Sequence, residues 1–186
     1  MAVSTAAHYP ERVEALVMID GGFFSPQMLP GATWEAFSQR LAPRDVSGTR
    51  AEFLARIGGQ LAMCWNDEVE RIVQTMVYEE DGQIYDILRP KNQAQVIWAM
   101  WDDPASDAWH RIECPSLIVP AGPSAERANT EFARNRKRMV NLAADAIPNC
   151  RVQWIPDTIH DIGYHKPEEL VEAILDFVDA EGAAEH

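Results

Sequence analysis

The pattern of hydrophobic and polar positions along the chain contains three short apolar runs, and a longer segment follows each of them. They lie at residues 13–19, 116–120 and 150–155. Short runs rich in β-branched residues and closed by Asp, Gly or Pro are typical of buried strands. Segments with helical spacing follow the second and third runs. This alternation predicts an α/β fold in which a parallel sheet is flanked by helices.

A long segment between the first two predicted strands differs in character. Four residues in it have the chemistry that starts helices: Thr33, Thr49, Asn66 and Pro90. Glu52 lies three residues after Thr49, the spacing of a capping box. We therefore expect a mostly helical insertion over residues 23–110 between two parts of a core formed by residues 1–22 and 111–186.

The most informative stretch follows the third predicted strand. It reads P-D-T-x-H-D-I over residues 156–162 and then K-P-E-E-L over residues 166–170, where an amphipathic helix begins. This stretch resembles the C-terminal end of α/β-hydrolase-fold enzymes. The resemblance implies that His160, on the loop after a buried strand, is the counterpart of their catalytic base.

Two other blocks resemble the same family. Residues 9–22 carry Y-P-E-R-V and L-V-M-I-D-G-G, and residues 112–119 carry I-x-C-P-x-L-I-V. In the family the first block follows the nucleophile elbow, G-x-S-x-G. This sequence contains no such motif, and Gly122-Pro123-Ser124-Ala125-Glu126 comes nearest. The chain therefore resembles the C-terminal portion of the family, without the segment that carries the elbow. The resemblance implies that the helical insertion over residues 23–110 is the lid.

A nucleophile–histidine–acid triad also needs a carboxylate that orients the histidine. The family most often places it after the strand that corresponds to residues 117–119, where this sequence offers only the displaced Glu126. The family's alternative lies at the end of the preceding strand and matches Asp20. We take Asp20 as the first choice and Glu126 as the second. An Asp before Gly-Gly is also a turn residue, so a structural role for Asp20 stays open.

Aromatic residues are the candidates for substrate contact. We assign this role to Phe23, Trp98 and Trp101, which would favour a small, largely hydrophobic substrate, although residues at helical spacing also fit a core. The sequence does not distinguish esters from amides, epoxides or carbon–carbon bonds. No dinucleotide or phosphate-loop motif and no metal-ligand spacing occurs, so no cofactor and no metal are expected.

Charge and composition narrow the partners. The net charge is −13 and 47% of the residues are hydrophobic, which favours a globular protein and opposes binding to nucleic acid or to an anionic membrane. Three cysteines without a paired spacing suit a reducing compartment, and we expect a cytoplasmic protein. The basic residues of the helix predicted over 129–144 are assigned to its solvent side: Arg134, Arg136, Lys137 and Arg138.

Two functions of different classes follow. In the first, the chain is part of a hydrolase and holds the base and the acid of its triad. In the second, it is a catalytically inactive folded fragment or an association module. In the family the strand at residues 13–19 has a further neighbour, which this chain does not supply. We therefore expect a homo-oligomer through that open sheet edge, or poor solubility.

Overall fold

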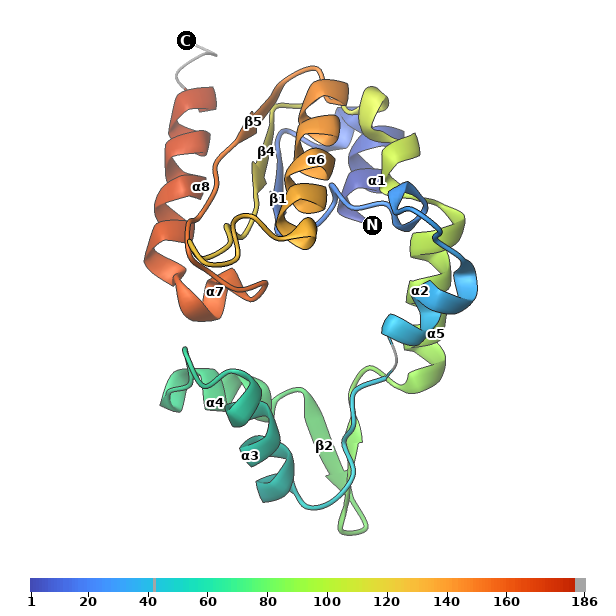
Figure 1. Ribbon diagram of the computed structural model, residues 1–186, viewed down its shortest axis with the longest axis vertical. Helices are drawn as coiled ribbons and strands as arrows, with labels where there is room; N and C mark the ends of the chain where they lie inside the picture. The colour runs from blue at the N-terminus through green and yellow to red at the C-terminus, as the bar shows by residue number, and fades with distance from the viewer. Residues whose placement is uncertain (42, 183–186) are drawn as a thin grey trace. The chain divides into compact units, whose positions relative to one another are not determined.

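The computed structural model describes residues 1–41 and 43–182, and it divides into two compact units. One unit combines Met1–Gly31 with the chain from Asp103 onward, and the other is Ala32–Asp102 (Figure 1). The range of 23–110 expected for the lid extends beyond this second unit at both ends. The reason is that Phe23 and Trp109 are buried in the core of the first unit.

A three-stranded parallel sheet forms the centre of the first unit. Its strands, in spatial order, are β1 (Leu16–Ile19), β4 (Ser116–Val119) and β5 (Cys150–Val152). Leu16 lies opposite Ser116, and Ser116 lies opposite Cys150. The parallel sheet predicted from the sequence is thereby confirmed. A further parallel bridge joins Ala121 to Ile155 beyond the strand ends.

The first strand is shorter than its apolar run. A short helical turn, η1 (Pro10–Arg12), ends when the N–H of Val13 bonds to the carbonyl of Pro10 at 3.3 Å. The ladder with β4 then starts where the N–H of Leu16 bonds to the carbonyl of Pro115 at 2.9 Å. Val13 therefore leads into the strand without belonging to it.

Helices cover both faces of the sheet (Figure 1). On one face lie α1 (Ala2–His8), η4 (Trp109–Arg111) and α6 (Glu131–Ala146), and on the other lie α7 (Ile162–His165) and α8 (Pro167–Gly182). The alternation along β4 divides the core accordingly. Ile118 packs in the cluster with α1 and α6, while Leu117 and Val119 pack in the cluster with α8. Two further short turns complete this unit: η2 (Pro26–Met28) and η3 (Ala105–Asp107).

The second unit is mostly helical. Its elements are α2 (Trp34–Arg40), α3 (Arg50–Gln60), α4 (Asp67–Gln74), β2 (Val77–Glu80), β3 (Gln83–Asp86) and α5 (Pro90–Asp102). The predicted caps are present. Thr33 accepts a hydrogen bond from the N–H of Ala36, and Thr49 forms the capping box with Glu52. None of the described helices in either unit is long and apolar enough to cross a membrane.

An antiparallel hairpin replaces the end of one predicted helix. The helical spacing of apolar residues that begins with Val69 and Val73 in α4 continues to Val77, yet Val77 begins β2 and pairs with Asp86. Asp81 and Gly82 both have positive φ, 51° and 72°, the geometry of the tight hairpin turn that Asp-Gly favours. The turn chemistry of Asp81-Gly82 and the burial of Val77 outweigh the helical spacing.

The open side of β1 leads to a prediction about association. Within the described residues β1 pairs only with β4, so the backbone groups of Val17 and Ile19 point away from the ladder. Ile19 is also exposed. We expect the chain to self-associate through this edge, because unpaired backbone groups beside apolar side chains pair readily with another strand.

Analytical ultracentrifugation over a range of concentrations tests this expectation. Ile19→Lys places a charge on the edge and should shift the distribution toward monomer. Val171→Lys, at an exposed apolar position on α8 and not on a strand, is the matched control and should leave association unchanged. A parent chain that stays monomeric at every concentration would contradict the expectation.

Candidate active site

Asp20 and His160 meet at the carboxyl ends of the strands. Asp20 directly follows β1, and His160 lies on the loop after β5. The imidazole Nδ1 of His160 lies 2.6 Å from Oδ2 of Asp20, although 140 residues separate the two in the sequence. The structure thus brings together the base and the first-choice acid expected from the sequence, at the end of a parallel sheet where ligands bind in α/β folds.

The carboxylate of Asp20 is fully enclosed, with a side-chain exposure of 0%. Its Oδ1 accepts a hydrogen bond of 2.8 Å from the N–H of Ala121, just past β4. The same oxygen forms an ion pair with Nη2 of Arg136 on α6. The backbone of Asp20 has a φ of +46°, a left-handed conformation that Asp tolerates better than most residues. This turn, together with the Ala121 contact, aims Oδ2 at His160.

Backbone hydrogen bonds hold the segment between β5 and His160 against Gly122, just past β4. The N–H of Gly122 donates to the carbonyl of Ile155 at 2.7 Å, and the N–H of Thr158 donates to the carbonyl of Gly122 at 3.0 Å. The Thr158 hydroxyl also lies 3.0 Å from Nδ1 of His165. A Cβ at residue 122 would lie only 2.9 Å from the Ile155 carbonyl oxygen, so this close approach requires glycine.

The imidazole of His160 is open to its surroundings, since 75% of its side chain is exposed. Asp20 occupies Nδ1, which leaves Nε2 as the nitrogen that can accept a proton from a reacting group. A base held at one nitrogen by a buried carboxylate is the arrangement by which an imidazole activates a nucleophile.

The two groups shift each other's ionisation. The hydrogen bond with Asp20 raises the pKa of His160 above its ordinary value, against the opposing effect of desolvation. Burial alone would raise the pKa of Asp20, but the hydrogen bonds from His160, Arg136 and Ala121 outweigh it and hold the pKa below its ordinary value. Asp20 is therefore a carboxylate over the whole range in which His160 titrates.

Arg136 corrects the sequence analysis, which placed it on the solvent side of its helix. Only 17% of its side chain is exposed, and its guanidinium carbon lies over the rings of Phe23 and Phe132, 6.0 and 5.7 Å from their centroids. Helical spacing in the sequence could have indicated that Arg136 is buried. Arg136 lies three and four residues from the buried positions of α6: Ala133, Met139 and Val140.

The second-choice acid lies apart from the histidine. Glu126 is exposed, and its carboxylate accepts a hydrogen bond of 3.5 Å from the hydroxyl of Ser124. In the part of the chain that the structure describes, the side-chain hydrogen bond of His160 is the one with Asp20. The geometry therefore favours Asp20 as the partner of the imidazole.

The three aromatic candidates for substrate contact fall in different places. Phe23 is 3% exposed and belongs to the core of the first unit, where its ring supports Arg136. Trp98 and Trp101 lie on α5 in the second unit, and both pack against Trp34 with ring centroids 4.9 and 6.1 Å away. Trp98 keeps 48% of its surface exposed, so it offers an apolar face within its own unit.

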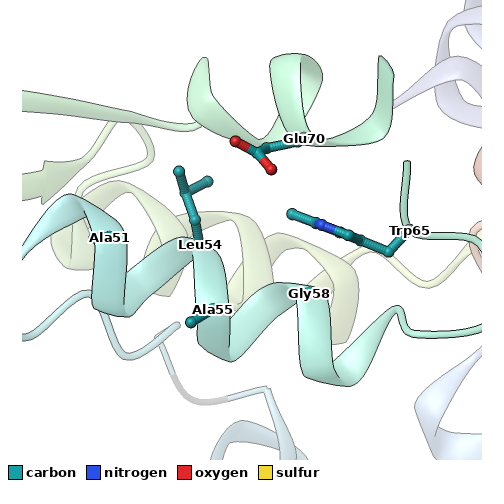
Figure 2. A pocket seen from close by; sticks show the side chains of 6 residues that line it. All are labelled: Ala51, Leu54, Ala55, Gly58, Trp65 and Glu70. Carbon is teal, nitrogen blue, oxygen red and sulfur yellow. The ribbon is translucent and has the colours of Figure 1, made fainter. Parts of the chain in front are cut away.

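A hollow in the second unit is lined by residues of α3 and α4 and the turn between them. It has a volume of about 440 Å³ and is lined by Ala51, Leu54, Ala55, Gly58, Trp65 and Glu70. Leu54 and Glu70 point toward each other across it (Figure 2). Its lining holds one carboxylate, that of Glu70, and no histidine, serine or cysteine, so it offers no pair of base and nucleophile.

Among the described residues of the first unit, a serine also lies beside a histidine. The hydroxyl of Ser4 lies 3.4 Å from Nδ1 of His8 and 3.4 Å from Oδ2 of Asp103. Nδ1 of His8 also lies 2.8 Å from the backbone carbonyl of Ser4, so this nitrogen carries the proton. It cannot accept one from the hydroxyl, and the pair does not form an activated nucleophile.

Two thiols of the same unit are also unsuited to attack. Burial raises the pKa of Cys150 to about 11, and burial likewise raises the pKa of Cys114. Both therefore stay protonated near neutral pH, whereas the thiolate is the reactive form. Among the described residues no three His, Cys, Asp or Glu side chains converge as a metal site.

Comparisons with known proteins identify the fold. The chain matches the crystal structure of E-2-(acetamidomethylene)succinate hydrolase with a TM-score of 0.72 and 21% identity, over 95% of this chain and 62% of that one. It matches MenH from S. aureus with a TM-score of 0.62 and 17% identity, over 97% and 64%. A thioesterase domain from the curacin biosynthetic pathway matches with a TM-score of 0.64 and 12% identity, over 94% and 62%.

These matches define the class of the protein. The chain has the α/β-hydrolase fold, as its sequence motifs indicated, and it spans less than two thirds of the length of these solved structures. No protein-family profile and no curated protein sequence matches it. At these identities the likeness establishes the fold, and the chemistry must be argued from the site.

The linked ionisation of Asp20 and His160 predicts a pH window of stability. The raised pKa of His160 gives a contribution that is complete below the ordinary value of about 6.5 and is lost as pH rises through the folded value. The lowered pKa of Asp20 gives a contribution that is present above about 3.8 and is lost as pH falls through the folded value. The pair should stabilise the fold most between these limits.

Urea unfolding of the parent and of Asp20→Asn at pH 5, 7 and 9 tests this window. The loss of unfolding free energy should be larger at pH 5 than at pH 9, because the imidazole is charged only at the lower pH. His110→Ala removes an exposed histidine of the same unit and serves as the control. A loss for Asp20→Asn that does not change with pH would show that the pair is not linked.

The hydrogen bonds between Gly122 and the His160 loop predict that a side chain at residue 122 lowers stability and changes the titration of His160. Gly122→Ala should push the Ile155 carbonyl away and destabilise the fold by about 1–3 kcal/mol. It should also lower the pKa of His160 toward its ordinary value, which NMR titration of the imidazole measures. Gly59→Ala, where an added Cβ meets nothing within 4 Å, is the matched control. An unchanged His160 titration in Gly122→Ala would mean that the contacts of Gly122 do not position His160.

Proposed function

We propose that this chain provides the base and the acid of a hydrolase that uses a nucleophile–histidine–acid triad. The observation that carries the proposal is the 2.6 Å contact between His160 Nδ1 and the enclosed carboxylate of Asp20, with the rest of the imidazole exposed. The solved structures with the same fold include a hydrolase, a thioesterase domain and an esterase, and they support the same reaction class.

In the proposed reaction, Nε2 of His160 takes the proton of an attacking hydroxyl and then delivers it to the leaving group. Asp20 holds the imidazole in the tautomer that leaves Nε2 free, and it stabilises the imidazolium that forms. The nucleophile is not among residues 1–186 as a G-x-S-x-G motif, so we assign it to polypeptide outside this sequence, either in a longer chain or in a complementing one.

We further propose that Ala32–Asp102 acts as the lid and that the substrate is small and largely hydrophobic. This unit is inserted in the sequence between β1 and β4, the position in which the family carries its lid, and Trp98 presents an exposed aromatic surface on it. Trp98→Ala should then raise KM more than it lowers kcat, because it removes apolar contact and leaves the reacting groups in place.

Reconstitution with the nucleophile tests the proposal. A reading frame upstream that encodes G-x-S-x-G would be expressed in fusion or together with this chain, and hydrolysis of an activated ester would be measured. His160→Ala should lower the rate by roughly four orders of magnitude, and Asp20→Asn by about two to four. Glu126→Gln is the matched acid control and should leave the rate unchanged.

The chain alone provides the second arm of this experiment. It should hydrolyse the same ester no faster than its His160→Ala variant, since the base has no nucleophile to activate. A rate well above background that disappears in His160→Ala would mean that residues 1–186 hold a nucleophile after all. A reconstituted enzyme that keeps its rate in His160→Ala would overturn the proposal.

The second candidate function is an inactive association module. The open edge of β1 and the lack of a nucleophile motif favour it. An oligomer of this chain that stays inert when the upstream segment is supplied would decide for this alternative.

A further inference from the structure

An enclosed carboxylate needs positive charge whether or not its histidine is protonated. Asp20 has no exposed side-chain surface, so water cannot solvate its charge. His160 supplies a positive charge only in its protonated form. A base, however, must be neutral when it begins to work, and at that moment His160 offers Asp20 a hydrogen bond but no charge.

Arg136 meets this requirement. Its guanidinium pairs with Oδ1 of Asp20 through Nη2, on the oxygen that His160 does not use. An arginine stays charged at any pH at which the protein is folded. The rings of Phe23 and Phe132 border the guanidinium, and this apolar setting strengthens its interaction with the carboxylate.

The contacts of Arg136 do not fit a side chain placed for stability alone. Its Nε is buried, and the described residues give it no hydrogen-bond acceptor. Such an orphaned donor costs free energy, and buried ion pairs in general add little net stability. The carboxylate of Asp20 gains an ion pair, while Nε of Arg136 is left without an acceptor among the described residues. This is expected if the role of Arg136 is to keep Asp20 charged.

We propose that Arg136 is the counter-ion of Asp20 that allows His160 to be neutral, and therefore basic, while the buried carboxylate remains charged. Arg136 is then a positioning residue that acts through Asp20 and does not touch the reacting atoms. This inference rests on the proposed function for its catalytic meaning, because a neutral imidazole matters only if His160 acts as a base.

The charges around His160 decide the direction of the test. They are Asp20 at the end of β1, Arg136 on α6 and Asp161 in the loop of His160 itself, while the segment after β4 contributes the backbone N–H of Ala121 to Asp20. Both carboxylates favour the imidazolium and Arg136 opposes it. Without Arg136, the buried carboxylate would draw its positive charge from His160, which would stay protonated to higher pH.

NMR titration of the His160 imidazole in the 186-residue chain tests the proposal without any need for catalysis. Arg136→Met should shift the titration midpoint of His160 to higher pH, and Arg136→Lys should return it toward the parent value. Lys137→Met, an exposed neighbour with the same change of charge, should leave it unchanged. A midpoint that is unchanged or lower in Arg136→Met would overturn the proposal.

Unfolding measurements provide a second readout if Arg136→Met folds poorly. Its loss of stability should grow as pH rises through the His160 titration, because the carboxylate then has no cation left. The added substitution Asp20→Asn should abolish that growth, since it removes the buried charge. A loss that is equal at pH 5 and pH 9, or that Asp20→Asn does not relieve, would mean that Arg136 only anchors α6.

The two proposals can fail separately. If the reconstituted enzyme is inactive but the His160 midpoint moves as expected, the counter-ion role stands and the hydrolase proposal fails. If the enzyme is active and the acidic limb of its pH–rate profile does not move in Arg136→Met, the hydrolase proposal stands and the counter-ion role fails.

Discussion

The enclosure of a single carboxylate is the constraint on which the site depends. Asp20 lies where three segments from distant parts of the sequence converge: the end of β1, the backbone just past β4 and the loop after β5, with α6 adding a fourth contact. No single one of these groups would stabilise the buried negative charge by itself. Together they supply an amide, a guanidinium and an imidazole to two oxygens, so the carboxylate fixes the relative positions of the elements that surround it.

The parallel sheet makes this convergence possible. Because β1, β4 and β5 run in the same direction, the turns that follow them share one edge, and residues far apart in sequence become neighbours there. The sheet's two cores, one against α1 and α6 and one against α8, hold the strands in register without contributing chemistry. The site is therefore precise because it stands on the ends of packed strands, even though its residues belong to loops.

The sequence predicted those parts that depend on local pattern. The three parallel strands, the helix caps at Thr33 and Thr49, and the position of His160 on the loop after the last strand all follow from residue types at fixed positions relative to an apolar run or a known motif. The start of β1, the end of β5 at Val152 and the change from helix to strand before Val77 do not follow from the spacing of apolar residues. The choice between Asp20 and Glu126 needed coordinates, since two carboxylates after neighbouring strands look alike until their distances are known.

Arg136 shows a different kind of miss, and it has a consequence for how this protein tolerates change. The counter-ion sits on the same face of α6 as Val140 and Ala143, which are fully enclosed in the core. A helix moves as a rigid piece, so a larger or smaller side chain at either core position would displace the guanidinium along with the turn that carries it. Core substitutions in α6 would then alter the acidity at which the imidazole works before they unfold the protein, which couples the packing of the interior to the pH range of the site.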